Sequence, residues 1–503
     1  MQPREAYAEL ARKVKEEAVL ASCVEVLGWD EETYMPEAGV AHRAEQQALL
    51  AGLLHDRATD PRLGELLATV EGSDLLADPD CAEAVNVREL RRLYNRAVRL
   101  PRSLVEEFAR ITSIAQREWV TAYEKRDWSL FQPWVEKIVK LKRAEAAALR
   151  PGNDLYETML DEYEPGITIR QVIAVFDALR GELVELVGAI SASGRRANLS
   201  ILHRYYPMDR QRQFGEMAAA AVGFDFRGGR LDTSPHPFFS RLGPGDCRIT
   251  TRFNLHHFGD GLFGILHEVG HALYEQGLDP AAYGLPMGES VSIGMHESQA
   301  RLWENTVGRS LPFWRHFFPH SRALFPEALR DVSVDEFYFA INHVAPSLNR
   351  VRADEVTYNL HILIRFELER SLVAGDLIAA DVPAAWNEQY RRYLGVKPPD
   401  DAEGCLQDGH WGGGLIGYFP TYTLGNLFAA QLFDRASADL GDLDDDFSQG
   451  RFDRLLGWLQ LRVYCHGQRY PAPRLIEHAT GTAPNPQPLL AGLRRKYGEL
   501  YGL

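Results

Sequence analysis

Apolar residues recur three or four positions apart along most of the chain, and this spacing predicts amphipathic helices. Residues 1–200 are rich in Ala, Leu, Glu and Arg, with breaks near Pro36, Pro101 and Pro151. The helical pattern returns at Asp260 and continues to the C-terminus, interrupted by loops rich in Gly and Pro. We therefore expect a mostly α-helical protein.

Between residues 201 and 255 the pattern changes. β-branched and aromatic residues are separated by turn residues in the segments ILHRYY, GRLDTSPHPFF and CRITTRFN. Such short runs are typical of strands, so the sequence predicts one small sheet just before the helix that starts at Asp260. Because no linker, repeat or low-complexity tract divides the chain, we expect residues 1–503 to form a single domain.

The composition is that of an ordinary globular protein, with 45% hydrophobic and 25% charged residues among 503. The net charge of −15 argues against a nucleic-acid-binding protein, which needs a basic surface. No apolar run is as long as a membrane span, the N-terminal segment is charged throughout, and the five cysteines are scattered. We expect a cytoplasmic protein without a disulfide framework, a membrane anchor or a nucleic-acid partner.

The segment DGLFGILHEVGHALYEQ contains the strongest chemical signal in the sequence. His267 and His271 are four residues apart, so both imidazoles lie on one face of a helix, with Glu268 beside that face. This is the zincin arrangement, in which zinc polarises a water molecule and the glutamate takes its proton. The alternative is an apolar core helix with two hydrogen-bonded histidines.

A catalytic zinc ion needs a third protein ligand. A metzincin would have glycine at Tyr274 and histidine at Gly277, and neither is present. The remaining candidates are three downstream carboxylates, those of Glu289, Glu297 and Glu304.

Helix geometry ranks these three carboxylates. The histidine helix is expected to end near Gly277, and a returning helix that starts near Glu289 places Glu297 about 12 Å along, level with the histidines. Glu304 overshoots by about 10 Å, so we expect it on a solvated or salt-bridged face. For Glu289 we expect a first-turn acid that faces the helix dipole.

Further segments occur in the order typical of one family. They are WDEETYMP, DCRIT, HEVGHALYEQG, GMHESQARLWEN, RVRADEVTYNLHI, GCLQDGHW, GYFPTYTLGN and KYGELYGL. With these segments the chain resembles, over essentially its whole length, the carboxypeptidase Taq family of zinc metallocarboxypeptidases. The resemblance implies a helical, saddle-like homodimeric subunit with one deep groove. It further implies a cap of residues 1–200 over one side of the groove and a catalytic core of residues 201–503.

The activity implied by the resemblance is the removal of single residues from the C-termini of peptides. His267, His271 and Glu297 look like the ligands of one Zn²⁺ per subunit, with cobalt also accepted, and Glu268 looks like the general base. Arg350 in NRVRAD looks like the arginine that holds the terminal carboxylate of the peptide, since a guanidinium can bind both oxygens.

The surroundings of Arg350 leave an alternative open. Arg350 could instead form an i,i+4 ion pair with Asp354 on a helix surface. The chain also departs from the family here, with Asn349 where an apolar residue is usual and Arg352 where an acid is frequent. We therefore expect the pocket for the terminal side chain to differ in polarity.

One more cation is a candidate for the site, and two residues of the N-terminal region are not. Arg248 in DCRIT is a second candidate cation beside the groove, the alternative being a strand-edge charge paired with Asp246. Trp29 and Asp30 are interpreted as structural residues that pack and cap a helix.

The loop QDGHW contributes Gln407, Asp408 and His410, which the family places at the substrate site, although a simple turn is the alternative. Tyr418 or Tyr422 in GYFPTYT is expected to be a second donor to the developing oxyanion, and the sequence does not select between them. Two other functions stay open. One is a zincin-type oligopeptidase or dipeptidase that cuts short peptides, and the other is a non-catalytic binding protein.

Overall fold

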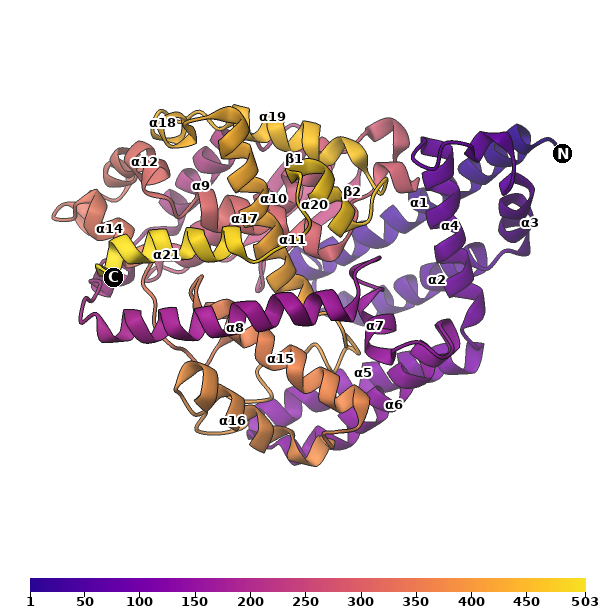
Figure 1. Ribbon diagram of the computed structural model, residues 1–503, viewed down its shortest axis with the longest axis horizontal. Helices are drawn as coiled ribbons and strands as arrows, with labels where there is room; N and C mark the ends of the chain where they lie inside the picture. The colour runs from indigo at the N-terminus through magenta and orange to yellow at the C-terminus, as the bar shows by residue number, and fades with distance from the viewer.

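The computed structural model describes residues 1–503, and it is mostly helical with one small sheet (Figure 1). Its α-helices are α1 (Pro3–Thr33), α2 (Val40–Ala58), α3 (Pro61–Val70), α4 (Ala82–Arg99), α5 (Arg102–Lys125), α6 (Gln132–Leu149), α7 (Leu155–Leu160), α8 (Ile169–Ala192), α9 (Met208–Val222), α10 (Phe258–Gly277), α11 (Ile293–Arg301), α12 (Leu311–Leu324), α13 (Pro326–Leu329), α14 (Val334–Ile341), α15 (Thr357–Ala374), α16 (Val382–Leu394), α17 (Pro420–Leu440), α18 (Leu443–Ser448), α19 (Asp453–Arg462), α20 (Ala472–Thr480) and α21 (Gln487–Tyr501). The predicted fold class and the breaks at the three prolines are confirmed. No helix has both the length and the apolar composition needed to cross a membrane.

The sheet consists of β1 (Gly229–Thr233), β2 (Phe239–Gly243) and β3 (Asp246–Thr251), in the order β1-β3-β2. Strand β1 is parallel to β3, and β2 is antiparallel to it. Helix α1 packs against β2 and α10 packs against β3, so the sheet lies beside the helix that carries the two histidines.

The predicted strand at ILHRYY is wrong. This segment begins in a 3₁₀ helix, Leu199–His203, and is followed directly by α9. The buried Tyr206 explains the compact turn, because its hydroxyl donates to the carbonyl oxygen of Ile201 at 2.7 Å. The aromatic and β-branched residues of this segment therefore lie in a 3₁₀ helix and the turn after it, and not in a β-strand.

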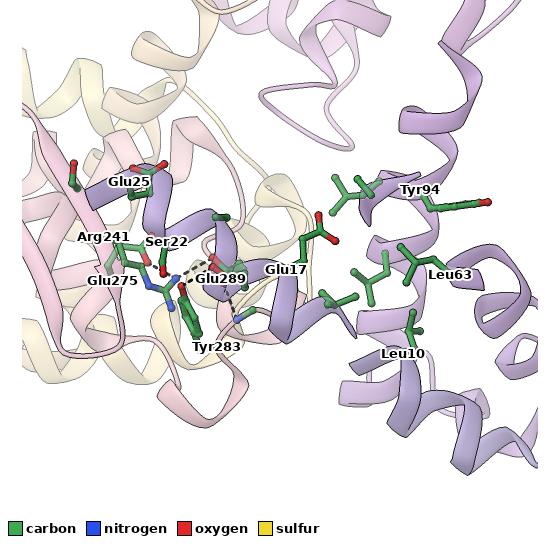
Figure 2. A pocket seen from close by; sticks show the side chains of 18 of the residues that line it. Leu10, Glu17, Ser22, Glu25, Leu63, Tyr94, Arg241, Glu275, Tyr283 and Glu289 are labelled. Carbon is green, nitrogen blue, oxygen red and sulfur yellow. Dashed lines mark hydrogen bonds and ion pairs between the residues drawn. The ribbon is translucent and has the colours of Figure 1, made fainter. Parts of the chain in front are cut away.

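Two hydrophobic clusters hold the chain together. The large one runs from Ile111 to Tyr501, and the small one joins α1, α3 and α4 through residues such as Leu10 and Leu66. A cavity of about 550 Å³ separates the small cluster from β2 and the C-terminal end of α10 (Figure 2). The division at residue 200 into cap and core stays a prediction.

Helix α11 packs closely against α10 and α17, and a glycine of each of these helices lies at the contact. A side-chain carbon at Gly270 of α10 would collide with the backbone of Gln299 and Ala300. One at Gly425 of α17 would lie 2.7 Å from Cγ of Glu297. These close approaches position α11 tightly against the histidine helix, because each glycine lets two backbones meet.

Candidate active site

Helices α10 and α11 bring three predicted ligands together. One ligand atom each from His267, His271 and Glu297 lies within 4.8 Å of the others. Oε2 of Glu297 is 3.7 Å from Nε2 of both histidines. Two imidazoles and one carboxylate that converge in this way fit a catalytic zinc or cobalt ion, which needs three protein ligands and an open position.

The geometric argument selected Glu297, the carboxylate that lies beside both histidines, but it assumed a wrong helix start. Helix α11 begins at Ile293, where the Ser292 side chain caps it, so Glu297 lies only about 6 Å along it. Glu289 lies in the preceding loop and pairs with Arg241 at 3.0 Å. The prediction that Glu289 is a first-turn acid is therefore wrong; the Gly/Pro-rich loop extends to Ser292 before the helix begins.

Glu304 supports the candidate ligands instead of joining them. Its half-buried carboxylate accepts from Nδ1 of His267 at 2.9 Å and from Arg301 at 3.3 Å. This confirms a salt-bridged position, and only 13% of the side chain is exposed to solvent. Arg301 also holds Oε1 of Glu297 at 2.6 Å, which leaves Oε2 for the histidines. Such supporting contacts orient metal ligands.

The electrostatics of the centre also favour a cation. Although burial alone would lower it, the carboxylates of Glu297 and Glu304 raise the pKa of His267 to about 9. Burial raises the pKa of Glu268 to about 7. Two buried carboxylates and the half-buried one of Glu304 therefore surround the histidines, and Arg301 is the one cation that pairs with two of the three.

The buried Arg350 begins a 3₁₀ turn, Arg350–Arg352, and does not lie on a helix surface. Its Nε and Nη2 donate to Oδ1 of Asp408 at 3.0 and 2.7 Å, and its backbone N–H donates to Gln407. Asp354 instead accepts from the backbone N–H of Thr357, the first residue of α15. The alternative of an exposed pair between Arg350 and Asp354 is excluded.

The two unusual neighbours of Arg350 are exposed. The Asn349 side chain accepts from the backbone N–H of Arg352 at 3.3 Å and so caps the 3₁₀ turn. The exposed Arg352 forms no ion pair. A local structural role therefore accounts for Asn349, and the predicted change in pocket polarity stays untested.

The loop residues form a charged cluster around Asp408. Its second oxygen, Oδ2, pairs with Nη2 of Arg365 at 2.6 Å, and His410 lies 3.7 Å from Oδ1. The guanidiniums of Arg365 and Arg350 overcome the effect of burial and hold the pKa of Asp408 far below its usual value. His410 Nε2 contacts the hydroxyl of Tyr422 at 3.1 Å. QDGHW is therefore more than a turn.

Burial and the neighbouring guanidiniums lower the pKa of His410 to about 4, against the opposing effect of Asp408. The imidazole is therefore neutral near pH 7 and acts through one donor and one acceptor. Its ring also packs against that of Tyr418, with centroids 5.6 Å apart. Tyr418 and Tyr422 flank the same histidine, so geometry does not select between them.

Tyr358 connects the two parts of the site. Arg301, which holds Glu297, stacks on the Tyr358 ring at 4.3 Å, and Nη1 of Arg350 donates to the Tyr358 hydroxyl at 3.1 Å. Helix α17, which packs on Glu297 through Gly425, also carries Tyr422. Tyr358 and helix α17 therefore contact both the candidate metal ligands and the arginine cluster.

Arg248 is separate from this assembly. It pairs with Asp246 at 2.8 Å and lies over the ring of Trp29 at 4.3 Å, which is the strand-edge alternative. The buried Trp29 packs as predicted. Asp30 does not cap a helix with its side chain, because that carboxylate pairs with Arg43 at 2.6 Å.

Sequence reasoning missed several supporting residues. They are Arg301, His296, Glu275, Tyr358 and Arg365. A signal was present for some of them, since Arg301 follows Glu297 by four residues and Glu275 follows His271 by four, on the same helix faces. Tyr358 and Arg365 come from α15, and no spacing relates that helix to the histidines.

Comparison with known proteins identifies the family. The model of the carboxypeptidase Taq (M32) metallopeptidases matches residues 9–497. The chain belongs to this family. It is 49% identical to thermostable carboxypeptidase 1 of Thermus thermophilus over the full length of both, and 36% identical to carboxypeptidase 1 of Bacillus subtilis over 96% of each. The crystal structure of an M32 carboxypeptidase from Deinococcus radiodurans superposes with a TM-score of 0.96 at 43% identity, over 99% of this chain and all of that one.

The resemblance stated from sequence is confirmed, and the protein is a metallocarboxypeptidase, a hydrolase of peptides that uses a divalent metal. The interpretation as a non-catalytic binding protein is wrong. The identity of the metal, the roles of single residues and the assembly state are matters for proposal.

Proposed function

We propose that the protein releases single amino acids from the free C-termini of peptides in a zinc-dependent reaction. One observation carries this proposal: Tyr358 joins the candidate ligand set to a buried cluster in which Arg350 and Arg365 share the single carboxylate of Asp408. Two guanidiniums on one carboxylate leave a net positive charge. That charge suits the terminal carboxylate of a substrate, which an internal peptide bond does not offer.

In the proposed reaction, a bound zinc ion supplies Lewis-acid polarisation of the last peptide carbonyl and of a water molecule. Glu268 takes a proton from the attacking water and passes it to the departing amine, and its raised pKa of about 7 suits both transfers. Arg350 holds the terminal carboxylate and so places the last peptide bond beside Glu268. His410, with Tyr418 or Tyr422, donates to the oxygen on which negative charge develops.

His267, His271 and Glu297 would hold the metal, with cobalt as an alternative ion. A homodimer and a cytoplasmic location are part of the proposal. The homodimer rests on the family resemblance, and the location is consistent with five cysteines that are all free.

Digestion of a mixed peptide library, followed over time by mass spectrometry, tests the proposal. We expect ladders in which each product is shorter by one C-terminal residue. Internal fragments, or the release of C-terminal dipeptides, would instead support the oligopeptidase or dipeptidase alternative. Zinc and cobalt should each restore activity to metal-depleted protein, and that restoration tests the proposed metal.

A further inference from the structure

The candidate ligand His271 has an unusual neighbour on its other nitrogen. Its Nδ1 is in direct contact with Nδ1 of His296, and the two ring centroids are 4.5 Å apart with the ring planes inclined by 30°. The second nitrogen of His296, Nε2, lies 3.1 Å from Oε1 of Glu275. Oε2 of Glu275 in turn pairs with Arg241 at 2.8 Å. We name His271, His296, Glu275 and Arg241 the histidine relay.

Hydrogen-bonding rules allow one proton arrangement in this relay when Nε2 of His271 binds metal. An imidazole that ligates through Nε2 carries its proton on Nδ1, so His271 must donate to His296. His296 must then present a bare Nδ1 and carry its proton on Nε2. An ionised carboxylate only accepts, so Glu275 is the partner that this second proton requires.

Arg241 keeps Glu275 in that accepting state. Figure 2 shows the two side chains together at one end of the 550 Å³ cavity, next to Glu289 and Tyr283. Burial alone would raise the pKa of Glu275, but His296 and Arg241 together hold it below its usual value. The carboxylate is therefore charged and turns one oxygen to the guanidinium and the other to the imidazole.

We propose that Glu275 and His296 are positioning residues that fix the tautomer of His271, so that its Nε2 faces the metal with a free lone pair. The inference rests on the proposed role of His271 as a ligand. The two histidine ligands then differ: His267 donates directly to the carboxylate of Glu304, whereas His271 reaches its carboxylate through a second imidazole. A direct acceptor holds one tautomer by itself. In the relay, by contrast, a change at Glu275 can reverse which nitrogen of His296 carries the proton.

The variant Glu275→Gln tests that inversion. Arg241 attracts the amide oxygen, so the amide NH₂ group turns to His296 and donates to Nε2. His296 must then carry its proton on Nδ1, where it opposes the proton of His271. We expect zinc affinity, measured by competition with a chromophoric chelator, to fall about 10- to 100-fold. Cobalt-loaded protein should show a changed visible absorption spectrum.

Two substitutions of similar size at His296 separate the relay from simple packing. In His296→Asn the side-chain oxygen replaces Nδ1 as an acceptor, whereas His296→Leu removes the acceptor. We expect the Asn variant to bind zinc more tightly than the Leu variant by about tenfold. If both variants lose affinity equally while their metal-free forms melt like the wild type, the ring acts by packing and the proposal is overturned.

Glu25→Gln is the matched control, because Glu25 lines the same cavity and forms no hydrogen bond or ion pair with the relay. Its zinc affinity should equal that of the wild type. Unchanged affinity in Glu275→Gln, with zinc bound to the wild type, would overturn the relay alone. Failure of the wild type to bind zinc would instead overturn the proposed function, so the two failures are distinguishable without a peptide substrate.

Discussion

The two parts of the candidate site are built differently. The metal part takes His267, His271 and Glu297 from two helices that touch through Gly270. The carboxylate-binding part takes Arg350 from a 3₁₀ turn and Asp408 from a loop. Helix geometry therefore fixes the first part, whereas ion pairs between distant segments fix the second.

The two parts have different proposed tasks: the metal part hydrolyses the peptide bond, and the arginine part selects which bond is hydrolysed. A zinc site with a neighbouring glutamate can hydrolyse many peptides, and the position of a cation decides which bond is presented. Changes in the metal part should therefore affect all substrates alike, whereas changes around Arg350 should affect peptides with a free C-terminus most.

Glu268→Gln should have the largest effect, because it removes the proposed proton carrier and leaves all three candidate ligands in place. We expect kcat to fall about 1000-fold or more on every peptide. Metal analysis of the same preparation should show the wild-type zinc content. A variant with full activity would contradict the role given to Glu268.

Arg350→Gln should lower kcat/KM for free peptides about 100-fold, because a buried charged partner of the terminal carboxylate is lost while Arg365 still pairs with Asp408. Steady-state kinetics on one peptide series measures this loss. The exposed neighbour provides a control, and Arg352→Gln should match the wild type. Equal losses in both variants would argue that charge near the site matters and the contact does not.

Gly270→Ala should separate the two helices of the metal part. The added carbon collides with the backbone of α11, so we expect unfolding free energy to fall by about 1–3 kcal/mol and zinc affinity to fall with it. Denaturant titration of the metal-free protein and chelator competition measure the two effects. Gly181→Ala in α8 has no atom within 4 Å to meet and should not destabilise. A stable Gly270→Ala variant with intact zinc binding would show that the close approach is dispensable.

Glu164→Gln tests the anchor at the start of α11. Burial raises the pKa of Glu164 to about 8, and its carboxyl accepts from the backbone N–H of Gly294. Above the usual carboxyl pKa the folded state holds one proton more than the unfolded state. Stability therefore falls as the pH rises from about 5 to 8, by up to about 1.4 kcal/mol per pH unit.

The Gln variant should lack the contribution of Glu164, so its slope should be shallower, as measured by urea unfolding at several pH values; the raised pKa of Glu268 keeps part of the slope. The exposed Glu162, which pairs with Arg96 at 2.8 Å, is the control. In Glu162→Gln the slope should remain. The same slope in Glu164→Gln would mean that other groups titrate.

The contrast between the two parts also explains what the sequence could predict. His267 and His271 are four positions apart and so share a helix face, which means that their spacing alone determines their relative geometry. Glu297 required a guess about where a helix starts, and that guess was four residues early because the loop continues to Ser292. The helical fold followed from apolar periodicity alone.

The carboxylate-binding part could not be derived in this way. Arg350 and Asp408 are separated by 58 residues of sequence, and Arg365 reaches the same carboxylate from α15. Local spacing instead favoured an ion pair between Arg350 and Asp354, which the fold does not form. Contacts between distant segments depend on packing. The family resemblance placed Arg350 and Asp408 at one site, but it anticipated neither their ion pair nor Arg365.

The most direct test of the central claim compares two peptides that differ only at the C-terminus, one with a free carboxylate and one amidated. The metal-loaded protein should release the last residue from the free peptide, with kcat/KM about 100-fold or more above that for the amidated one. Equal turnover of the two peptides would contradict a carboxypeptidase anchored by Arg350.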